Sequence, residues 1–100
     1  GTYSVNFMND TSYNIHKKLL TQEQSQKEIS LTSKEIVLLE YFLKYKDTII
    51  STDELKSVLW EDSDYATDSA LKNLLNKLRT KIGKTSISNI SGVGYRIILK

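Results

Sequence analysis

The sequence contains no cysteine and no proline, and it has a single histidine, His16. Without cysteine there is no disulfide framework, no thiol nucleophile and no cysteine-based zinc site, and one histidine cannot supply a multi-histidine metal cluster. A Ser-His-Asp triad would rest on His16 alone, with no neighbouring pattern to support it. We therefore expect no enzymatic activity, no metal and no cofactor.

Long apolar runs are also missing. The longest nearly apolar stretch, from Ile36 to Leu43, is eight residues long and contains Glu40, whereas a membrane-spanning helix needs about 20 apolar residues. No secretory-type leader precedes this stretch. These absences predict a soluble, cytoplasmic protein that contacts no membrane. A length of 100 residues predicts a single domain over 1–100.

Acidic residues are absent after Asp68. From Gly1 to Asp68 the chain has 7 Lys and 12 Asp or Glu, a charge of −5, whereas from Ser69 to Lys100 it has seven basic residues and no acid, a charge of +7. A one-sided basic segment on a small domain is typical of a polyanion partner. The alternative is a cationic face that simply faces water.

Three segments carry helical patterns. The first two, about 33–45 and 52–60, each begin with a capping-box sequence, Thr32-x-x-Glu35 and Ser51-x-x-Glu54, and continue with apolar residues at helical spacing. The third, about 67–82, ends at Gly83, a residue that tolerates the conformation that closes a helix.

The third helix has two contrasting faces. Leu71, Leu75, Leu78 and Ile82 fall on one side at 100° per residue, and this side is expected to be buried. The opposite side is polar and cationic, without any acid, and Arg79 lies at its edge. This exposed side consists of Ser69, Lys72, Asn73, Asn76, Lys77 and Thr80. A helix of this composition suits a DNA groove.

Strand patterns lie on either side of the helices. Alternation at the front predicts an antiparallel sheet over about 3–31, in which Leu19-Leu20 end the second strand, 21–26 form a polar turn and 28–31 form a further short strand. At the back, 86–99 predicts a hairpin that turns at Gly92-Val-Gly94. The expected class is therefore α+β, with an amino-terminal sheet, three helices and a carboxy-terminal hairpin.

This order of elements is that of a winged helix-turn-helix, in which the third helix enters the major groove and the hairpin wing lies on adjacent backbone. Four motifs strengthen the resemblance: Thr32-x-x-Glu35 before Leu38-Leu39, Ser51 to Leu55 followed by Trp60, Leu78-Arg79-x-Lys81-Ile82, and Gly92-Val-Gly-Tyr-Arg96. In this order, they resemble the carboxy-terminal effector domains of OmpR/PhoB-type bacterial response regulators. The match covers essentially the whole chain.

The resemblance implies a sequence-specific, double-stranded DNA-binding domain of a two-component transcription regulator. It implies a second copy bound alongside on direct repeats, usually head to tail, and a phosphoacceptor receiver domain in the full-length protein. Because no receiver fits in 100 residues, we expect an excised effector domain; a relative without a receiver, or one tethered to a membrane, is the alternative.

Side-chain chemistry assigns expected roles on the DNA face. Lys72, Asn76 and Lys77 are placed to reach base edges, where lysine can donate to guanine and asparagine can pair bidentately with adenine. Ser69 and Asn73 lie one turn earlier and suit either bases or phosphate. The resemblance makes Arg79 a phosphate contact, which Thr80, Lys81 and Lys84 would extend. For Arg79 and Lys81, the alternative is a simple complement to the helix dipole.

The wing and one loop carry the remaining expectations. In the wing turn, Ser91, Gly92, Val93 and Gly94, the glycines supply unusual backbone angles, and Ser91 stands where the family often has an arginine that enters the minor groove. Tyr95 is expected either to bind a phosphate or to pack on the sheet, and Arg96 either to bind a phosphate or to form an ion pair. The loop Glu61, Asp62, Ser63, Asp64 and Tyr65 corresponds to the family's RNA polymerase contact.

Two alternatives accompany these expectations. The acidic loop can instead favour the start of the next helix, capped by Thr67 or Asp68, or repel DNA from non-productive contacts; its spacing does not fit a calcium site. The whole domain can instead be a winged-helix protein-interaction module whose basic helix binds an acidic partner. Binding to duplex DNA at low salt separates these functions.

Overall fold

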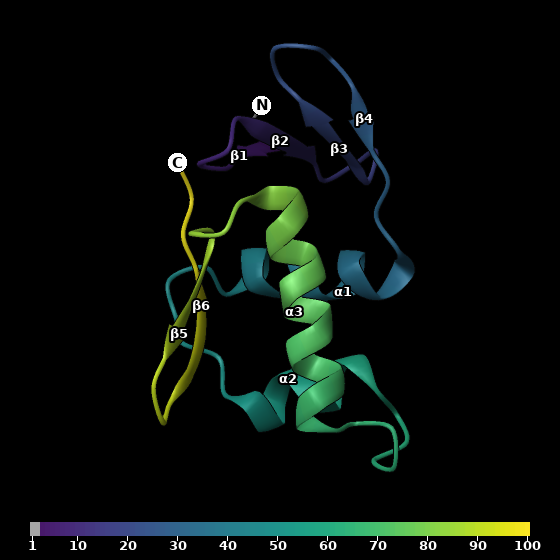
Figure 1. Ribbon diagram of the computed structural model, residues 1–100, viewed down its shortest axis with the longest axis vertical. Helices are drawn as coiled ribbons and strands as arrows, with labels where there is room; N and C mark the ends of the chain where they lie inside the picture. Colours follow the sequence, from purple (N-terminus) through teal and green to yellow (C-terminus); the bar gives the residue numbers. More distant parts are fainter. Residues whose placement is uncertain (1–2) are drawn as a thin grey trace.

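A computed structural model describes residues 3–100 (Figure 1). Four strands come first, then three helices, then two strands. Their bounds are β1 (Ser4–Asn6), β2 (Thr11–Asn14), β3 (Leu19–Gln22), β4 (Glu28–Ile29), α1 (Ser33–Lys44), α2 (Thr52–Leu59), α3 (Asp68–Ile82), β5 (Ile87–Ile90) and β6 (Gly94–Ile97). This confirms the expected α+β winged helix-turn-helix with an amino-terminal sheet and a carboxy-terminal hairpin.

The amino-terminal sheet is antiparallel with the strand order β1-β2-β3-β4. The expectation that Leu19-Leu20 end the second strand is wrong. The chain turns between Asn14 and Leu19, where Lys18 adopts a positive φ of 56°, and Leu19 then pairs with Asn14 to begin β3. Residues 21 and 22, expected in a turn, continue β3, and the following turn ends with Gln26 at a φ of 58°.

The amino terminus of α1 is fixed by the expected capping box. The Glu35 amide donates to Thr32 Oγ1 at 3.2 Å, and the Thr32 amide donates to Glu35 Oε1 at 2.8 Å. Each partner thereby satisfies a backbone donor that the helix leaves unpaired. The buried face of α1 presents Leu38, Leu39 and Phe42 to the core.

Only the first half of the second capping box forms. Ser51 Oγ accepts the Glu54 amide at 3.1 Å, but the Glu54 carboxylate accepts the Tyr41 hydroxyl of α1 instead of the Ser51 amide. The expected second box is therefore corrected to a single cap. Through this bond to Tyr41, the Glu54 carboxylate links α2 to α1.

The third helix begins and ends as its sequence predicts. Thr67 caps it by accepting the Ala70 amide at 3.0 Å, and Gly83 follows it at a φ of 110°. The apolar stripe is buried, with Leu71, Leu75, Leu78 and Ile82 all at 2% exposure or less. The polar stripe of α3 therefore faces away from the core.

The wing is hydrogen-bonded through its backbone to the loop between α1 and α2. Ile50 forms a β-bridge with Tyr95, in which each amide donates to the other residue's carbonyl, at 2.8 and 2.9 Å. The backbones come so close that a Cβ on Gly94 would lie 2.1 Å from the Ile50 carbonyl oxygen. At the tip, Gly92 has open space around it and a φ of 74°. Gly94 therefore allows two backbones to approach closely, whereas Gly92 allows a positive φ in the turn.

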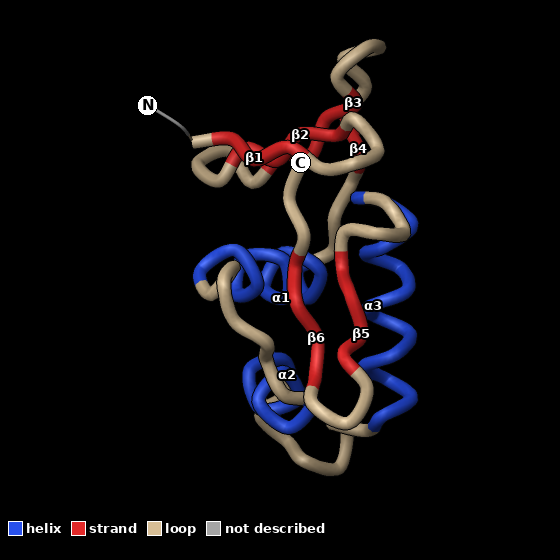
Figure 2. Tube along the Cα trace, turned by 90° about the vertical axis from the view of Figure 1, so that its left-hand side faces the viewer, coloured by secondary structure: helices blue, strands red, loops and turns tan. Residues whose placement is uncertain are grey.

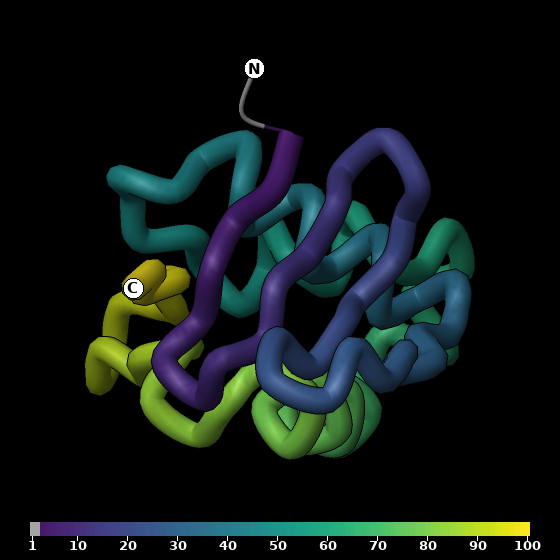
Figure 3. Tube along the Cα trace, turned by 90° about the horizontal axis from the view of Figure 1, so that it is seen from above, coloured from purple at the N-terminus to yellow at the C-terminus, as the bar shows by residue number. Residues whose placement is uncertain are grey.

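One hydrophobic core joins the sheet, the helices and the wing. The sheet contributes Tyr13 and Leu20, and the connection between β1 and β2 contributes Phe7. The wing contributes Ile87, Tyr95 and Ile97, and the helices supply most of the remainder. Figure 2 shows the hairpin alongside the helices, and Figure 3 looks down on the sheet with α3 nearly end-on beneath it. No helix within 3–100 is long and apolar enough to cross a membrane.

Candidate nucleic-acid interface

The exposed side of α3 is continuous and free of acid from Ser69 to the end of the helix. Ser69, Asn73, Asn76 and Thr80 follow one another along this side, one turn apart, and all four are exposed. Lys72 and Lys77 are exposed on its two flanks. The arrangement offers hydrogen-bonding groups along the centre and positive charge at both edges. The predicted exposure of this polar side is thereby confirmed.

Five of the seven basic residues after Asp68 form no ion pair with any residue in 3–100. These five are Lys72, Lys77, Arg79, Lys84 and Arg96. The other two are neutralised within the protein: Lys81 by Glu35 at 2.6 Å and Lys100 by Asp10 at 2.8 Å. The positive charge available to a partner is therefore smaller than the sequence total of +7.

Lys81 points away from the exposed stripe, toward α1. Its ammonium donates to the Glu35 carboxylate and to the Ser30 carbonyl at 2.8 Å. Burial raises the pKa of Glu35, but the hydrogen bonds from Lys81 and from the Thr32 amide outweigh it and hold the pKa below its usual value. Lys81 thus fastens the end of α3 to the start of α1 and is not grouped with the other cations.

Arg79 connects α3 to the wing. Its Nε donates to the Ile87 carbonyl of β5 at 3.1 Å, and its guanidinium lies 5.8 Å from the centre of the Tyr95 ring. One terminal nitrogen also donates to Asn76 Oδ1 at 3.4 Å. Arginine has five N–H donors, so donors remain that can reach a phosphate.

The wing presents a polar turn and one cation. Ser91, Gly92 and Val93 are exposed at the tip, whereas Gly94 is buried against Ile50. The Tyr95 ring packs in the core at 7% exposure, and Arg96 lies exposed on the opposite face of β6. The described residues offer Arg96 no ion-pair partner, so the ion-pair alternative lacks support.

The acidic loop between α2 and α3 is exposed throughout, from Glu61 to Tyr65. Asp62 Oδ1 accepts the Asp64 amide at 2.9 Å, and the Tyr65 side chain is 68% exposed. Beyond the loop, Asp68 pairs with Lys56 of α2 at 2.6 Å. Figure 1 shows the loop next to the start of α3, so it adjoins the candidate interface.

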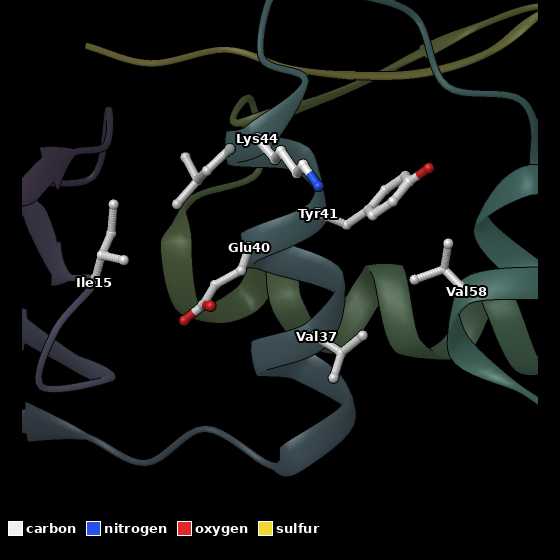
Figure 4. Close-up of a pocket in the computed structure, with 7 residues that line it drawn as sticks. Ile15, Val37, Glu40, Tyr41, Lys44 and Val58 are labelled. Atoms are coloured by element: carbon white, nitrogen blue, oxygen red, sulfur yellow. The ribbon is translucent and has the colours of Figure 1, made fainter.

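A groove of about 530 Å³ lies on the side of α1 away from α3 (Figure 4). Glu40 lies within it and accepts Lys18 at 2.6 Å. Its lining residues are Ile15, Val37, Glu40, Tyr41, Leu43, Lys44 and Val58. None of them belongs to the predicted site. No group of three or more His, Asp or Glu side chains within 3–100 is placed to hold a metal ion.

Residues 26–97 match the family described as "Transcriptional regulatory protein, C terminal". The chain belongs to this family. Among its relatives, the transcriptional regulatory protein CrdR of Helicobacter pylori is 44% identical over 73 residues, 73% of this chain and 33% of that protein. The corresponding figures for CusR of Escherichia coli are 37% over 73 residues, 69% and 32%. The chain therefore spans about a third of the length of these regulators.

Solved structures share the fold of this member of the family. The DNA-binding domain of Bacillus subtilis CssR superposes with a TM-score of 0.70 at 28% identity, covering 83% of this chain and 93% of that one. Thermotoga maritima DrrB, described as an OmpR/PhoB homologue, gives a TM-score of 0.76 at 19% identity over 93% of this chain and 43% of that one. The likeness to DrrB, at 19% identity, shows the fold alone. Together with the family match, the relatives confirm the expected OmpR/PhoB-type resemblance.

Two residues shape the site although the sequence does not mark them for it. The sequence identifies Glu35 only as a helix cap, and its pairing with Lys81 spans 46 residues of sequence. Asn9 donates to the Lys81 carbonyl at 3.1 Å and so anchors the end of α3 from the amino-terminal sheet. No local pattern marks either contact, because both depend on how distant elements pack.

Proposed function

We propose that this chain binds double-stranded DNA, with α3 in the major groove and the wing on the adjacent backbone. The observation that carries the proposal is the exposed, acid-free side of α3, flanked by cations that form no ion pair with any acid of the described chain. Arg79 ties the wing to the same helix. Helix and wing can therefore approach one duplex together.

Within this proposal, the residues divide by chemistry. Lys72, Asn76 and Lys77 are the candidates for base edges, and Ser69 and Asn73 serve bases or phosphates. Phosphate contacts are assigned to residues beside the stripe and on the wing: Arg79, Thr80, Lys84 and Arg96, with the backbone of 91–94. Tyr95 takes the packing role that was its alternative, because it is only 7% exposed. Lys81 keeps a structural role, because its ammonium is engaged by Glu35 and Ser30.

The relatives support this choice. The CssR structure is described as a DNA-binding domain, and its 28% identity over most of this chain exceeds a likeness of fold alone. We further propose the role of an effector domain in a bacterial two-component regulator that acts in the cytoplasm. A receiver domain in the full-length protein and a second copy on direct-repeat half-sites belong to that proposal.

The loop from Glu61 to Tyr65 is proposed as a contact for RNA polymerase. Three carboxylates and an exposed tyrosine beside the start of α3 suit a basic protein surface that approaches from the side. The proposal describes a binding domain and not an enzyme, and it calls for no cofactor.

A fluorescence-anisotropy titration against random duplex DNA, repeated across salt concentrations, tests the function. The five unpaired cations predict that log affinity falls with log salt with a slope of about 4 to 5 in magnitude, at ~0.9 per phosphate neutralised. Absence of binding at low salt would refute DNA binding and favour the protein-interaction module with an acidic partner.

Alanine variants test the division of roles, once a preferred duplex has been selected from a random library. Asn76→Ala and Lys77→Ala should weaken the selected duplex more than random DNA, because base contacts depend on sequence. Arg79→Ala should weaken both alike, because phosphates are present in every sequence. Equal losses on both duplexes for all three variants would contradict the division.

A further inference from the structure

Asn76 and Arg79 form a contact that bears on which base the helix selects. The terminal nitrogen of Arg79 donates to Asn76 Oδ1 at 3.4 Å, one turn apart on the exposed side of α3. Arg79 is not free to follow Asn76, because its Nε is bound to the Ile87 carbonyl and its guanidinium lies over Tyr95. The asparagine therefore meets a donor whose position the wing determines.

Chemistry decides which end of the amide faces Arg79. A guanidinium has five donors and no acceptor, so only the amide oxygen of Asn76 can face it, and the NH₂ end would repel it. The positive charge of the donor favours this orientation of the amide even at the long distance of 3.4 Å. The amide orientation is thus set by the partner.

The orientation changes what Asn76 offers to DNA. The bidentate pairing with adenine expected from the sequence needs both ends of the amide: the oxygen for N6 and the NH₂ group for N7. With its oxygen turned toward Arg79, Asn76 presents two N–H donors, and its oxygen is less available to the N6 donor of adenine. The major-groove edge of guanine offers N7 and O6, both acceptors, whereas adenine places a donor beside its N7.

We propose that Arg79 holds the Asn76 amide as a donor, so that Asn76 selects guanine and disfavours adenine. Arg79 then acts on specificity through Asn76 as a positioning residue, in addition to any phosphate contact of its own. The inference rests on the proposed DNA binding and adds the base class to it.

Affinity selection from a random duplex library, with the wild-type chain and Asn76→Ala in parallel, identifies the base that faces Asn76. It is the position at which the variant alone loses preference, and we expect guanine there. Replacing that guanine by adenine should weaken the wild type about 2- to 10-fold, the range of one hydrogen bond, and should leave Asn76→Ala almost unaffected. Adenine at this position, or no position that loses preference, would overturn the inference.

Two further variants examine the role of Arg79. Asn76→Asp keeps an oxygen for Arg79 but has no donor, so it should lose the guanine preference. Arg79→Ala frees the amide to rotate and should reduce the discrimination between guanine and adenine. Lys27→Ala is the control, because it removes one charge from an exposed residue outside the proposed interface. Retained preference in Asn76→Asp, or equal loss of discrimination in Lys27→Ala and Arg79→Ala, would overturn the inference.

The outcomes separate this inference from the function on which it rests. If the wild type binds no duplex at low salt, the proposed function fails and the inference fails with it. If the wild type selects a sequence whose base opposite Asn76 is adenine, the function stands and the inference alone is overturned. Circular dichroism confirms that each variant is folded.

Discussion

Glu35 is nearly inaccessible at 1% exposure and takes part in two interactions at once. It completes the cap of α1 and neutralises Lys81 of α3. Because its folded-state pKa lies below the ordinary 4.5, the stabilisation from its charged form is complete above about pH 4.5 and is lost as the pH falls through the lower folded value. A buried carboxylate thus makes the packing of α3 sensitive to acid.

Glu35→Gln should lower the free energy of unfolding by about 1–3 kcal/mol at pH 7, because Lys81 is left without its charge partner in a partly buried place. The difference from the wild type should shrink as the pH falls below about 4.5 and toward the lowered pKa of the folded-state carboxylate. Urea denaturation at pH 7 and at about pH 3 measures both effects.

Lys81→Met and Lys84→Met provide the matched pair of controls. Lys84 is exposed, and none of the described residues forms an ion pair with it, so its replacement should change stability much less. Equal effects of the two substitutions on unfolding would show that the Glu35 contact does not hold α3 in place.

At the scale of elements, the wing depends on two glycines for different reasons. Gly94→Ala should cost about 3 kcal/mol or more, because its Cβ would meet the Ile50 carbonyl oxygen at 2.1 Å. Gly92→Ala should cost only about 1–2 kcal/mol, the strain of a positive φ in otherwise open space. Thermal and urea unfolding of both variants test this order, and a greater loss for Gly92→Ala would contradict it.

The helices could be predicted because their determinants are local. Thr32, Ser51 and Thr67 each cap a helix within three residues, and the Leu71-to-Ile82 stripe lies within one segment. Strand β3 could not be placed, because Leu19 and Thr21 become a strand only by pairing with β2 and β4. The exposed stripe of α3 was likewise predictable from helical period.

The contacts that hold the exposed stripe of α3 in place could not be predicted from the sequence. Lys81 and Arg79 belong to one short motif, yet the first turns to α1 and the second to the wing. Side chains so close in sequence receive different roles because the elements on either side of α3 differ. Only the packed structure distinguishes them.

At the scale of the whole molecule, the charge separation along the chain becomes a separation in space. In the carboxy-terminal third, Lys81 pairs with Glu35 and Lys100 pairs with Asp10. The lysines on the flanks of α3 form no such pair within the described chain, so these flanks stay positive. Position, and not net charge, should therefore govern binding to a polyanion.

Two double variants with the same net charge test this expectation. Lys72→Gln with Lys77→Gln, and Lys17→Gln with Lys27→Gln, each lower the formal charge from +2 to zero, and all four lysines are exposed. The first pair should reduce the magnitude of the salt slope for duplex binding by about 1.8, at ~0.9 for each cation lost from the interface, because a lysine that reaches a base edge also neutralises the adjacent phosphates. The second pair should leave it nearly unchanged. Equal reductions would mean that the duplex senses only the overall charge.

The reciprocal pairing of Ile50 with Tyr95 also has a consequence for deuterium exchange. Both amides are protected by bonds across the boundary between the wing and the helical part, so they exchange only when that boundary opens. The Val93 amide bonds to Ile90 within the turn and exchanges when the turn alone opens. Protection at these three amides therefore distinguishes a wing that detaches as a unit from one that loosens only at its tip.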